Sequence, residues 1–270
     1  MSVSADRSGP FSLQDCIAIE HAEPALWVRA LPELIRSGTS DAAALPCAGG
    51  WALYFGGGTP LSYAIGVGVG QAVDAATFGA IERFYRERGV SPCFEVSPLA
   101  DPAIYEFLGE GCYRPRLFFN LLAHDLSGNF GASSAAIAIR EVLTPDEREV
   151  WHRTVVEGFA SSEGETWIDT AIRHNAHAAN HLFLAWIDGQ PASGSALALI
   201  DGVAVLFGGS TRPAFRCRGV QSAMVQARLL RARQAGARLA AVKMQVASPS
   251  QRTMERAGFR VLYSRVRMTP

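Results

Sequence analysis

The chain has 270 residues, which is more than one typical domain of roughly 150 residues and compatible with two. Its 25 Lys and Arg residues balance 25 Asp and Glu residues, so the sequence lacks the basic surplus that sequence-independent nucleic-acid binding or attachment to an acidic membrane needs. Hydrophobic residues make up 49% of the chain, and this apolar content excludes an intrinsically disordered protein.

Membrane insertion and export are also not expected. The longest apolar run, residues 196–209, is interrupted by Asp201 and is shorter than the roughly 20 apolar residues of a membrane span. The N-terminal residues contain Asp6 and Arg7 and no apolar signal-peptide core. The cysteines lack Cys-x-x-Cys spacing, which argues against a disulfide framework and a zinc site: Cys16, Cys47, Cys93, Cys112 and Cys217. We therefore expect a cytoplasmic protein without a metal.

The first half predicts a helix, a strand, a helix and a strand. Residues 81–88 form the first helix, which Gly89 ends, and residues 93–96 are a strand. Asp101-Pro102 begins a short second helix, Gly111 ends it, and residues 117–123 form the next strand. Ser, Gly and Asn gather in residues 124–136, so we place a domain boundary there, between domains 1–130 and 131–270.

The second half begins with strand 136–143, followed by a helix over residues 145–159 with Thr144 as its N-cap. Three strands follow, and the Asp-Gly pairs at 188–189 and 201–202 predict tight hairpins between them. The remaining elements are a helix over residues 221–234, a strand over 239–246, a short helix after Pro249 and a strand over 259–268.

The two halves repeat this order at an offset of 147 residues. Gly89 corresponds to Gly236, Pro102 to Pro249, and Gly111 to Gly258. Each of these residues marks the same helix boundary in its half. The repeat predicts an internal duplication.

Residues 216–222 join the last hairpin strand to the longest helix of the second half. Gly219 allows a close backbone approach, and the unpaired N–H groups of a helix N-terminus favour an anion when arginines such as Arg216 and Arg218 flank them. Neither a Walker loop nor a dinucleotide fingerprint is present. The segment predicts a pyrophosphate site.

In this context, residues 216–221 (RCRGVQ) resemble the pyrophosphate loop of the GNAT N-acetyltransferase superfamily, which has the form Gln/Arg-x-x-Gly-x-Gly/Ala. Arg216 and Gly219 match, whereas Gln221 stands where the family has Gly or Ala. Pro213 and the closing ERAGF at 255–259 extend the resemblance from residue 136 to the end. It implies a mixed α/β fold of two tandem acyl-CoA N-acyltransferase-like domains, each with a central, mostly antiparallel sheet flanked by helices.

The resemblance further implies acetyl-CoA as cosubstrate and a set of residues that bind it. In the family fold, two strands separate at a bulge, for which Gly208-Gly209 is suited, so that the next two residues face the pantetheine arm. The expected cosubstrate residues are Ser210, Thr211, Arg216, Cys217, Arg218, Gly219, Val220, Gln221, Ser222, Ser250 and Thr253.

The loop equivalent in the first half is residues 69–74 (VGQAVD), which have no arginine and add Asp74. We interpret the first half as a degenerate copy without a phosphate loop, which forms a wall of the acceptor pocket.

Proton transfer has no clear residue. The family commonly has a tyrosine, as general acid, four residues before the closing glycine, where this chain has Met254. Glu157, Glu163 and Glu165 are weak candidates for the base. Cys217 as an acyl-carrying nucleophile ranks below direct transfer.

Three histidines, His174, His177 and His181, share helical spacing, which allows a metal site or proton relay but favours a polar helix face.

The resulting hypothesis is an acetyl-CoA-dependent N-acetyltransferase that transfers acetyl directly to the amine of a small-molecule acceptor and acts as a monomer or homodimer. The alternative is a non-catalytic acyl-CoA-binding or sensor protein. A structural protein without a ligand is a third possibility.

Overall fold

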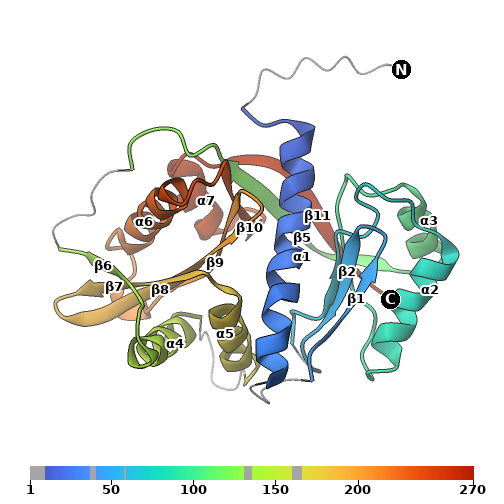
Figure 1. Cartoon of the computed structure of the whole chain (residues 1–270), viewed down its shortest axis with the longest axis horizontal. Coiled ribbons are helices and arrows are strands. Elements are labelled where there is room, and N and C mark those ends of the chain that lie inside the picture. Colours follow the sequence, from blue (N-terminus) through green and yellow to red (C-terminus); the bar gives the residue numbers. More distant parts are fainter. Residues whose placement is uncertain (1–9, 37–40, 58, 131–135, 160–165) are drawn as a thin grey trace.

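The computed structural model describes residues 10–36, 41–57, 59–130, 136–159 and 166–270. The first half contains, in order, α1 (Leu13–Arg36), β1 (Ala43–Cys47), β2 (Gly50–Tyr54), β3 (Tyr63–Ile65), α2 (Ala75–Arg86), β4 (Phe94–Val96), α3 (Ala103–Glu110) and β5 (Arg114–His124). Figure 1 shows α1 between the two groups of elements that the halves form.

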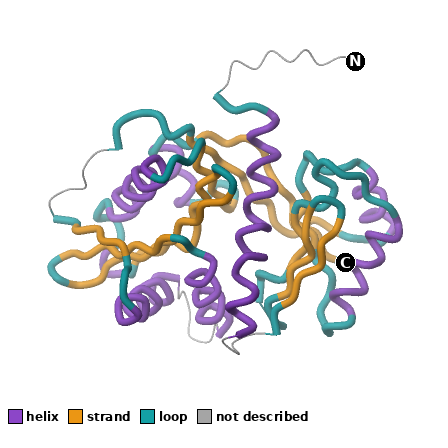
Figure 2. The backbone as a smooth tube through the Cα atoms, viewed as in Figure 1, coloured by secondary structure: helices purple, strands orange, loops and turns teal. Residues whose placement is uncertain are grey.

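The second half contains β6 (Ala138–Glu141), α4 (Pro145–Phe159), α5 (Thr166–Ala178), β7 (His181–Ile187), β8 (Gln190–Ile200), β9 (Val203–Thr211), a short 3₁₀ turn (Pro213–Phe215), α6 (Val220–Gln234), β10 (Leu239–Gln245), α7 (Pro249–Arg256) and β11 (Arg260–Thr269). Figure 2 shows helices of this half on both sides of its strands. Among the described helices, none is long and apolar enough to cross a membrane.

The predicted elements of both halves are confirmed. The Asp-Gly hairpins pair Ile187 with Gln190 and Ile200 with Val203. Thr144 caps α4, and its hydroxyl accepts from the Glu147 N–H at 3.2 Å. At the offset of 147 residues, α2, β4, α3 and β5 correspond to α6, β10, α7 and β11.

All the strands join in one sheet, in the order β1-β2-β3-β4-β11-β5-β10-β9-β8-β7-β6. The last strand of each half lies between two strands of the other: β5 pairs with β10 and β11, and β11 pairs with β4 and β5. The mixed α/β fold class is confirmed. The boundary between residues 130 and 131 stays a prediction, and the two halves share one sheet through these strands.

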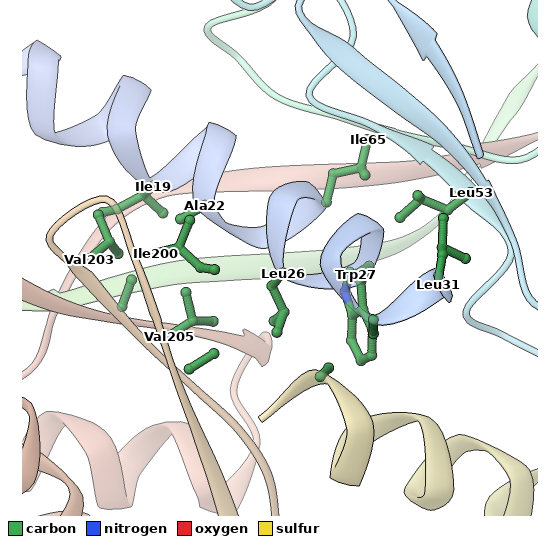
Figure 3. Packing of buried hydrophobic residues seen from close by; sticks show 14 of the residues in the cluster. Ile19, Ala22, Leu26, Trp27, Leu31, Leu53, Ile65, Ile200, Val203 and Val205 are labelled. Atoms are coloured by element: carbon green, nitrogen blue, oxygen red, sulfur yellow. The ribbon is translucent and has the colours of Figure 1, made fainter. Parts of the chain in front are cut away.

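Helix α1, which is absent from the predicted elements, packs between the halves. Its Leu26 and Trp27 are 1% and 6% exposed. They belong to one apolar cluster with Leu53 of β2 and Val205 of β9, as Figure 3 shows. Pro24 and Pro32 lie inside the helix, where proline removes a backbone donor, so the sequence carries a signal against this helix.

Strands β9 and β10 separate along their length. They pair in parallel only from Leu239 to Ala241, opposite Val203 to Val205, although both strands continue beyond. The β8–β9 register shifts where Gly194 and Ala196 face Ser210 and Phe207. The expected bulge at Gly208-Gly209 is therefore present, and it lies where the strands diverge.

Candidate functional site

A polar cavity of about 770 Å³ lies at the open end of β9, between α6 and α7. It is lined by every expected cosubstrate residue except Arg218. Those residues are Ser210, Thr211, Arg216, Cys217, Gly219, Val220, Gln221, Ser222, Ser250 and Thr253. The structure thus brings the residues of the sequence hypothesis into one wall.

The N-terminus of α6 forms one side of the polar cavity. Gly219 is the N-cap, with a φ of +77°, in the left-handed region that favours glycine. Cys217 is exposed and also has a positive φ, of +62°. The first-turn N–H groups of a helix have no helical acceptor, and Val220, Gln221 and Ser222 line this cavity. The turn can therefore offer backbone donors and the positive end of a helix dipole to an anion.

Three arginines add positive charge to the same cavity: Arg216, Arg252 and Arg256. The described lining residues include no carboxylate. Arg218 instead lies outside the wall, with its Nη2 3.5 Å from Asp188 Oδ2. Sequence reasoning missed Arg252 and Arg256, although their spacing of four residues on a helix was a usable signal that they share a face.

Side chains of the wall are held by hydrogen bonds behind it. Ser210 Oγ donates to Val155 O at 2.9 Å, and Thr211 Oγ1 donates to Ser193 Oγ at 3.2 Å. Gln221 departs from the family pattern, but its Nε2 donates to Thr211 Oγ1 at 3.0 Å and thereby ties α6 to β9. These contacts fix the backbone of the cavity.

Arg216 lines the polar cavity and also binds the backbone behind it. Its Nε donates to Thr211 O at 3.3 Å and its Nη2 donates to Gly158 O at 3.1 Å. On α7, Thr253 Oγ1 donates to Pro249 O at 3.2 Å, whereas Ser250 is exposed.

An apolar cavity of about 480 Å³ adjoins the polar one. The two walls share Phe159, Gly209, Gln221 and Ser250. Its apolar lining comes from both halves of the chain: Ile19, Leu26 and Trp27 of α1, Leu61, Leu117, Phe119 and Leu121 of the first half, and Val205 and Phe207 of β9. The polar cavity and the apolar cavity thus meet beside the bulge at Gly209.

Charged residues at the edge of the apolar cavity form a buried cluster. Lys243 Nζ donates to Glu23 Oε1 at 2.6 Å, to Glu95 Oε1 at 2.8 Å and to the Tyr63 hydroxyl at 3.1 Å. Arg265 Nη1 donates to Glu23 Oε2 at 2.5 Å and to Glu95 Oε1 at 3.2 Å. The cations therefore have carboxylate partners within the protein.

These contacts and the burial of the cluster shift the pKa values of Glu23 and Tyr63. Burial raises the pKa of Glu23, but Lys243 and Arg265 outweigh it and hold that pKa below its ordinary value. Burial raises the pKa of Tyr63 to about 12. Both oxygens of Glu23 accept hydrogen bonds from cations, so Glu23 is a poor proton acceptor at neutral pH.

The expected proton-transfer residues are placed as follows. Glu157 pairs with Arg212 at 2.5 Å and is outside the described walls of both cavities. Glu163 and Glu165 lie outside the described residues. Met254 is 4% exposed and lines the apolar cavity, where its thioether has no proton to donate.

The polar-face interpretation of the histidines is wrong for His174, which is fully buried on α5. Neither of its ring nitrogens has a hydrogen-bond partner among the described residues, and burial lowers its pKa to about 4. His181 lies on β7 rather than on the helix, where its Nδ1 contacts Glu141. Groups of three or more potential metal-ligating side chains are absent from the described part of the chain.

A glycine-capped helix N-terminus with three arginines, beside diverging parallel strands, agrees with the expected transferase family. Residues 137–259 match the model of the acetyltransferase (GNAT) family. The expected enzyme class, an acetyltransferase, is confirmed by this match. A search of curated proteins finds no match.

Solved GNAT structures share the fold over nearly the whole chain. A GCN5-related N-acetyltransferase from Kribbella flavida has a TM-score of 0.65 and 17% identity, over 91% of this chain and 94% of that one. A tandem GNAT protein from the clavulanic acid biosynthesis pathway has a TM-score of 0.59 and 17% identity, over 93% of this chain and 95% of that one. At these identities the likeness concerns the fold alone.

Proposed function

We propose that the chain is an acetyl-CoA-dependent N-acetyltransferase that moves acetyl directly from the thioester to the amine of a small-molecule acceptor. The observation that carries the proposal is the junction of the two cavities at Gly209. The polar cavity suits the pyrophosphate and pantetheine of CoA, and the apolar cavity suits the acceptor. A thioester held at the junction therefore lies next to both cavities.

Each part of the wall has a role in this proposal. The first-turn amides of α6 and Arg216, Arg252 and Arg256 hold the pyrophosphate. The backbone at Ser210 and Thr211 orients the pantetheine arm, because the strand beyond Val205 has no β10 partner. Acetyl-CoA supplies the activated acyl group. The amine forms a C–N bond to the acyl carbon as the C–S bond breaks, and the thiolate ends as a thiol with a proton that the amine releases through solvent.

The first half, in this proposal, is a copy that binds no CoA. Asp74 caps α2, the equivalent of α6, and its Oδ1 accepts from the Thr77 N–H at 2.8 Å. This carboxylate occupies the helix N-terminus and repels a phosphate there. The first half instead supplies α1 and β5 to the wall of the apolar cavity. A cytoplasmic location and a monomeric or homodimeric state complete the proposal.

Calorimetric titration of acetyl-CoA into the wild-type protein and Arg252→Ala tests the CoA site. Arg252 lines the polar cavity and is exposed, so its removal is expected to leave the fold intact and to weaken binding about tenfold, the value of one charge-assisted hydrogen bond. Arg83→Ala, an exposed arginine on α2, is the matched control. Absence of binding to the wild type, or equal binding by all three proteins, contradicts the assignment.

The alternative is a non-catalytic acyl-CoA-binding or sensor protein. Two observations favour it: Met254 has no proton to donate, and both carboxylate oxygens of Glu23 already accept hydrogen bonds from cations. A thiol-release assay with acetyl-CoA over a panel of amines separates the two functions. Thiol release above the rate without acceptor supports the transferase. Stoichiometric binding without release by any amine supports the alternative.

A further inference from the structure

Arg228 on α6 is a buried guanidinium without a carboxylate partner among the described residues. It is 1% exposed. Its Nε donates to Met224 O at 3.3 Å and its Nη1 to Ala196 O at 3.4 Å, while its Nη2 is buried without a hydrogen-bond partner. Two long bonds to neutral carbonyls leave a buried charge uncompensated, which is costly in a protein interior.

The position of Arg228 connects it to the proposed reaction centre. The side chain contributes to the wall of the apolar cavity. A Cβ on Gly209 would lie 3.7 Å from Nη2 and 3.8 Å from Nη1, so the guanidinium faces the backbone of the residue that both cavities share. Arg228 therefore lines the apolar cavity beside Gly209, a residue of both cavity walls.

Arg228 differs from the other cations in the same wall. Lys243 and Arg267 both donate to Glu95, and Lys243 also donates to Glu23. Burial lowers the pKa of Arg228 to about 10, so the group remains charged at neutral pH. The counter-ion that is missing for Arg228 can therefore come from a ligand.

We propose that Arg228 binds the carboxylate of the acceptor and that the acceptors are apolar α-amino acids; this inference rests on the proposed function. In such a molecule the amine and the carboxylate share one carbon, so both groups fit at the junction near Gly209. The apolar side chain then fills the cavity lined by Leu26, Trp27 and Phe207. A guanidinium is suited to this role because its fork of donors matches a carboxylate.

The binding test needs no transfer. Calorimetry with CoA present compares 3-phenylpropanoate with its neutral amide, 3-phenylpropanamide, in the wild type and in Arg228→Gln. We expect the variant to lose affinity for the carboxylate about tenfold and to bind the amide as the wild type does. Equal affinities for the carboxylate overturn the proposal, whether or not the chain acetylates any amine.

The transfer test uses two decarboxylation pairs, phenylalanine with 2-phenylethylamine and leucine with 3-methylbutylamine. We expect the wild type to have a kcat/KM at least tenfold higher for each amino acid, and Arg228→Gln to remove this preference. Arg231→Gln, on the same helix but in contact with Glu141, is the control and is expected to retain it. Wild-type transfer to amines without a preference for the amino acids overturns the inference and leaves the proposed function standing.

Two results would give Arg228 a role other than binding the acceptor carboxylate. An Arg228-dependent preference for succinyl-CoA over acetyl-CoA places the carboxylate on the acyl group and overturns the acceptor assignment. An equal loss for both members of each pair indicates a role toward the thioester or the fold, and also overturns it. Arg228→Lys keeps the cation without the fork, and it replaces Arg228→Gln in every comparison if that variant does not retain acetyl-CoA binding.

Discussion

Replacement of Glu95 by glutamine is the sharpest test of the buried cluster that joins the halves. The Glu95 side chain is fully buried on β4, and it accepts from Lys243 at 2.8 Å, Arg265 at 3.2 Å and Arg267 at 2.7 Å. Burial alone raises the pKa of Glu95, but these cations reverse the effect and lower it from 4.5 to about 2. The difference between these two pKa values of Glu95 corresponds to about 3 kcal/mol of folding free energy at neutral pH.

The variant leaves three cations with two carboxylates, Glu20 and Glu23. Since removal of one partner from a buried ion pair costs about 3–5 kcal/mol, we expect Glu95→Gln to lower the free energy of unfolding by about 3 kcal/mol or more. Urea denaturation at pH 7 measures it. Glu106→Gln, an exposed glutamate of the same half, is the control and is expected to be within about 0.5 kcal/mol of the wild type.

The pH dependence provides a second measurement. Because the folded pKa of Glu95 lies below the unfolded one, its contribution is present above about pH 4.5 and is lost as the pH falls toward 2. The stability gap between wild type and Glu95→Gln should therefore narrow over this window. A gap below about 1 kcal/mol at pH 7, or one that does not change with acidification, would refute the reasoning.

Three further changes test the packing around the site. Gly194→Ala places a Cβ 2.4 Å from Val155 Cγ2, and we expect a loss of about 1–3 kcal/mol in urea denaturation; unchanged stability would contradict the packing. Leu26→Ala, at a residue 1% exposed, is expected to lose about 2–5 kcal/mol by the same measurement, and a neutral result would show that α1 is not part of the core. Residues 136–270 expressed alone leave β10 and β11 without β5, so we expect aggregation, with solubility restored by co-expression of residues 1–130; a soluble fragment that binds acetyl-CoA would contradict it.

The sequence predicts the local part of the site because its signals are local. The helix that begins after Gly219, the bulge at Gly208-Gly209 and the Asp-Gly hairpins each depend on residues a few positions apart. The repeat at an offset of 147 residues shows which elements of the first half correspond to which elements of the second. Ten of the eleven residues expected from these signals line the polar cavity, whereas Arg252 and Arg256 in the same wall were not expected.

The apolar cavity was not predictable in the same way. Helix α1 contains two prolines, which disfavour a helix in a local pattern, although tertiary packing on both halves stabilises it. Arg228 carried a signal, because it lies four residues from Met224 and from Ala232 on the buried face of α6. An arginine in an apolar stripe marks a buried charge, and the identity of its partner then depends on long-range contacts.

The exchange of strands links the proposed CoA site to both halves of the chain. Strand β10 leaves β9 after Ala241, but β5 continues to pair with it as far as Gln245, opposite Phe119. Beyond Ala241, the β10 backbone groups that point toward β5 therefore stay paired, while those that point toward β9 lie on an open edge. Beyond this point the open edge provides the junction at Gly209, and β5 and α1 close the apolar cavity behind it. The first half thus contributes to the proposed site in two ways: β5 pairs with β10 where β9 no longer does, and first-half residues line the apolar cavity.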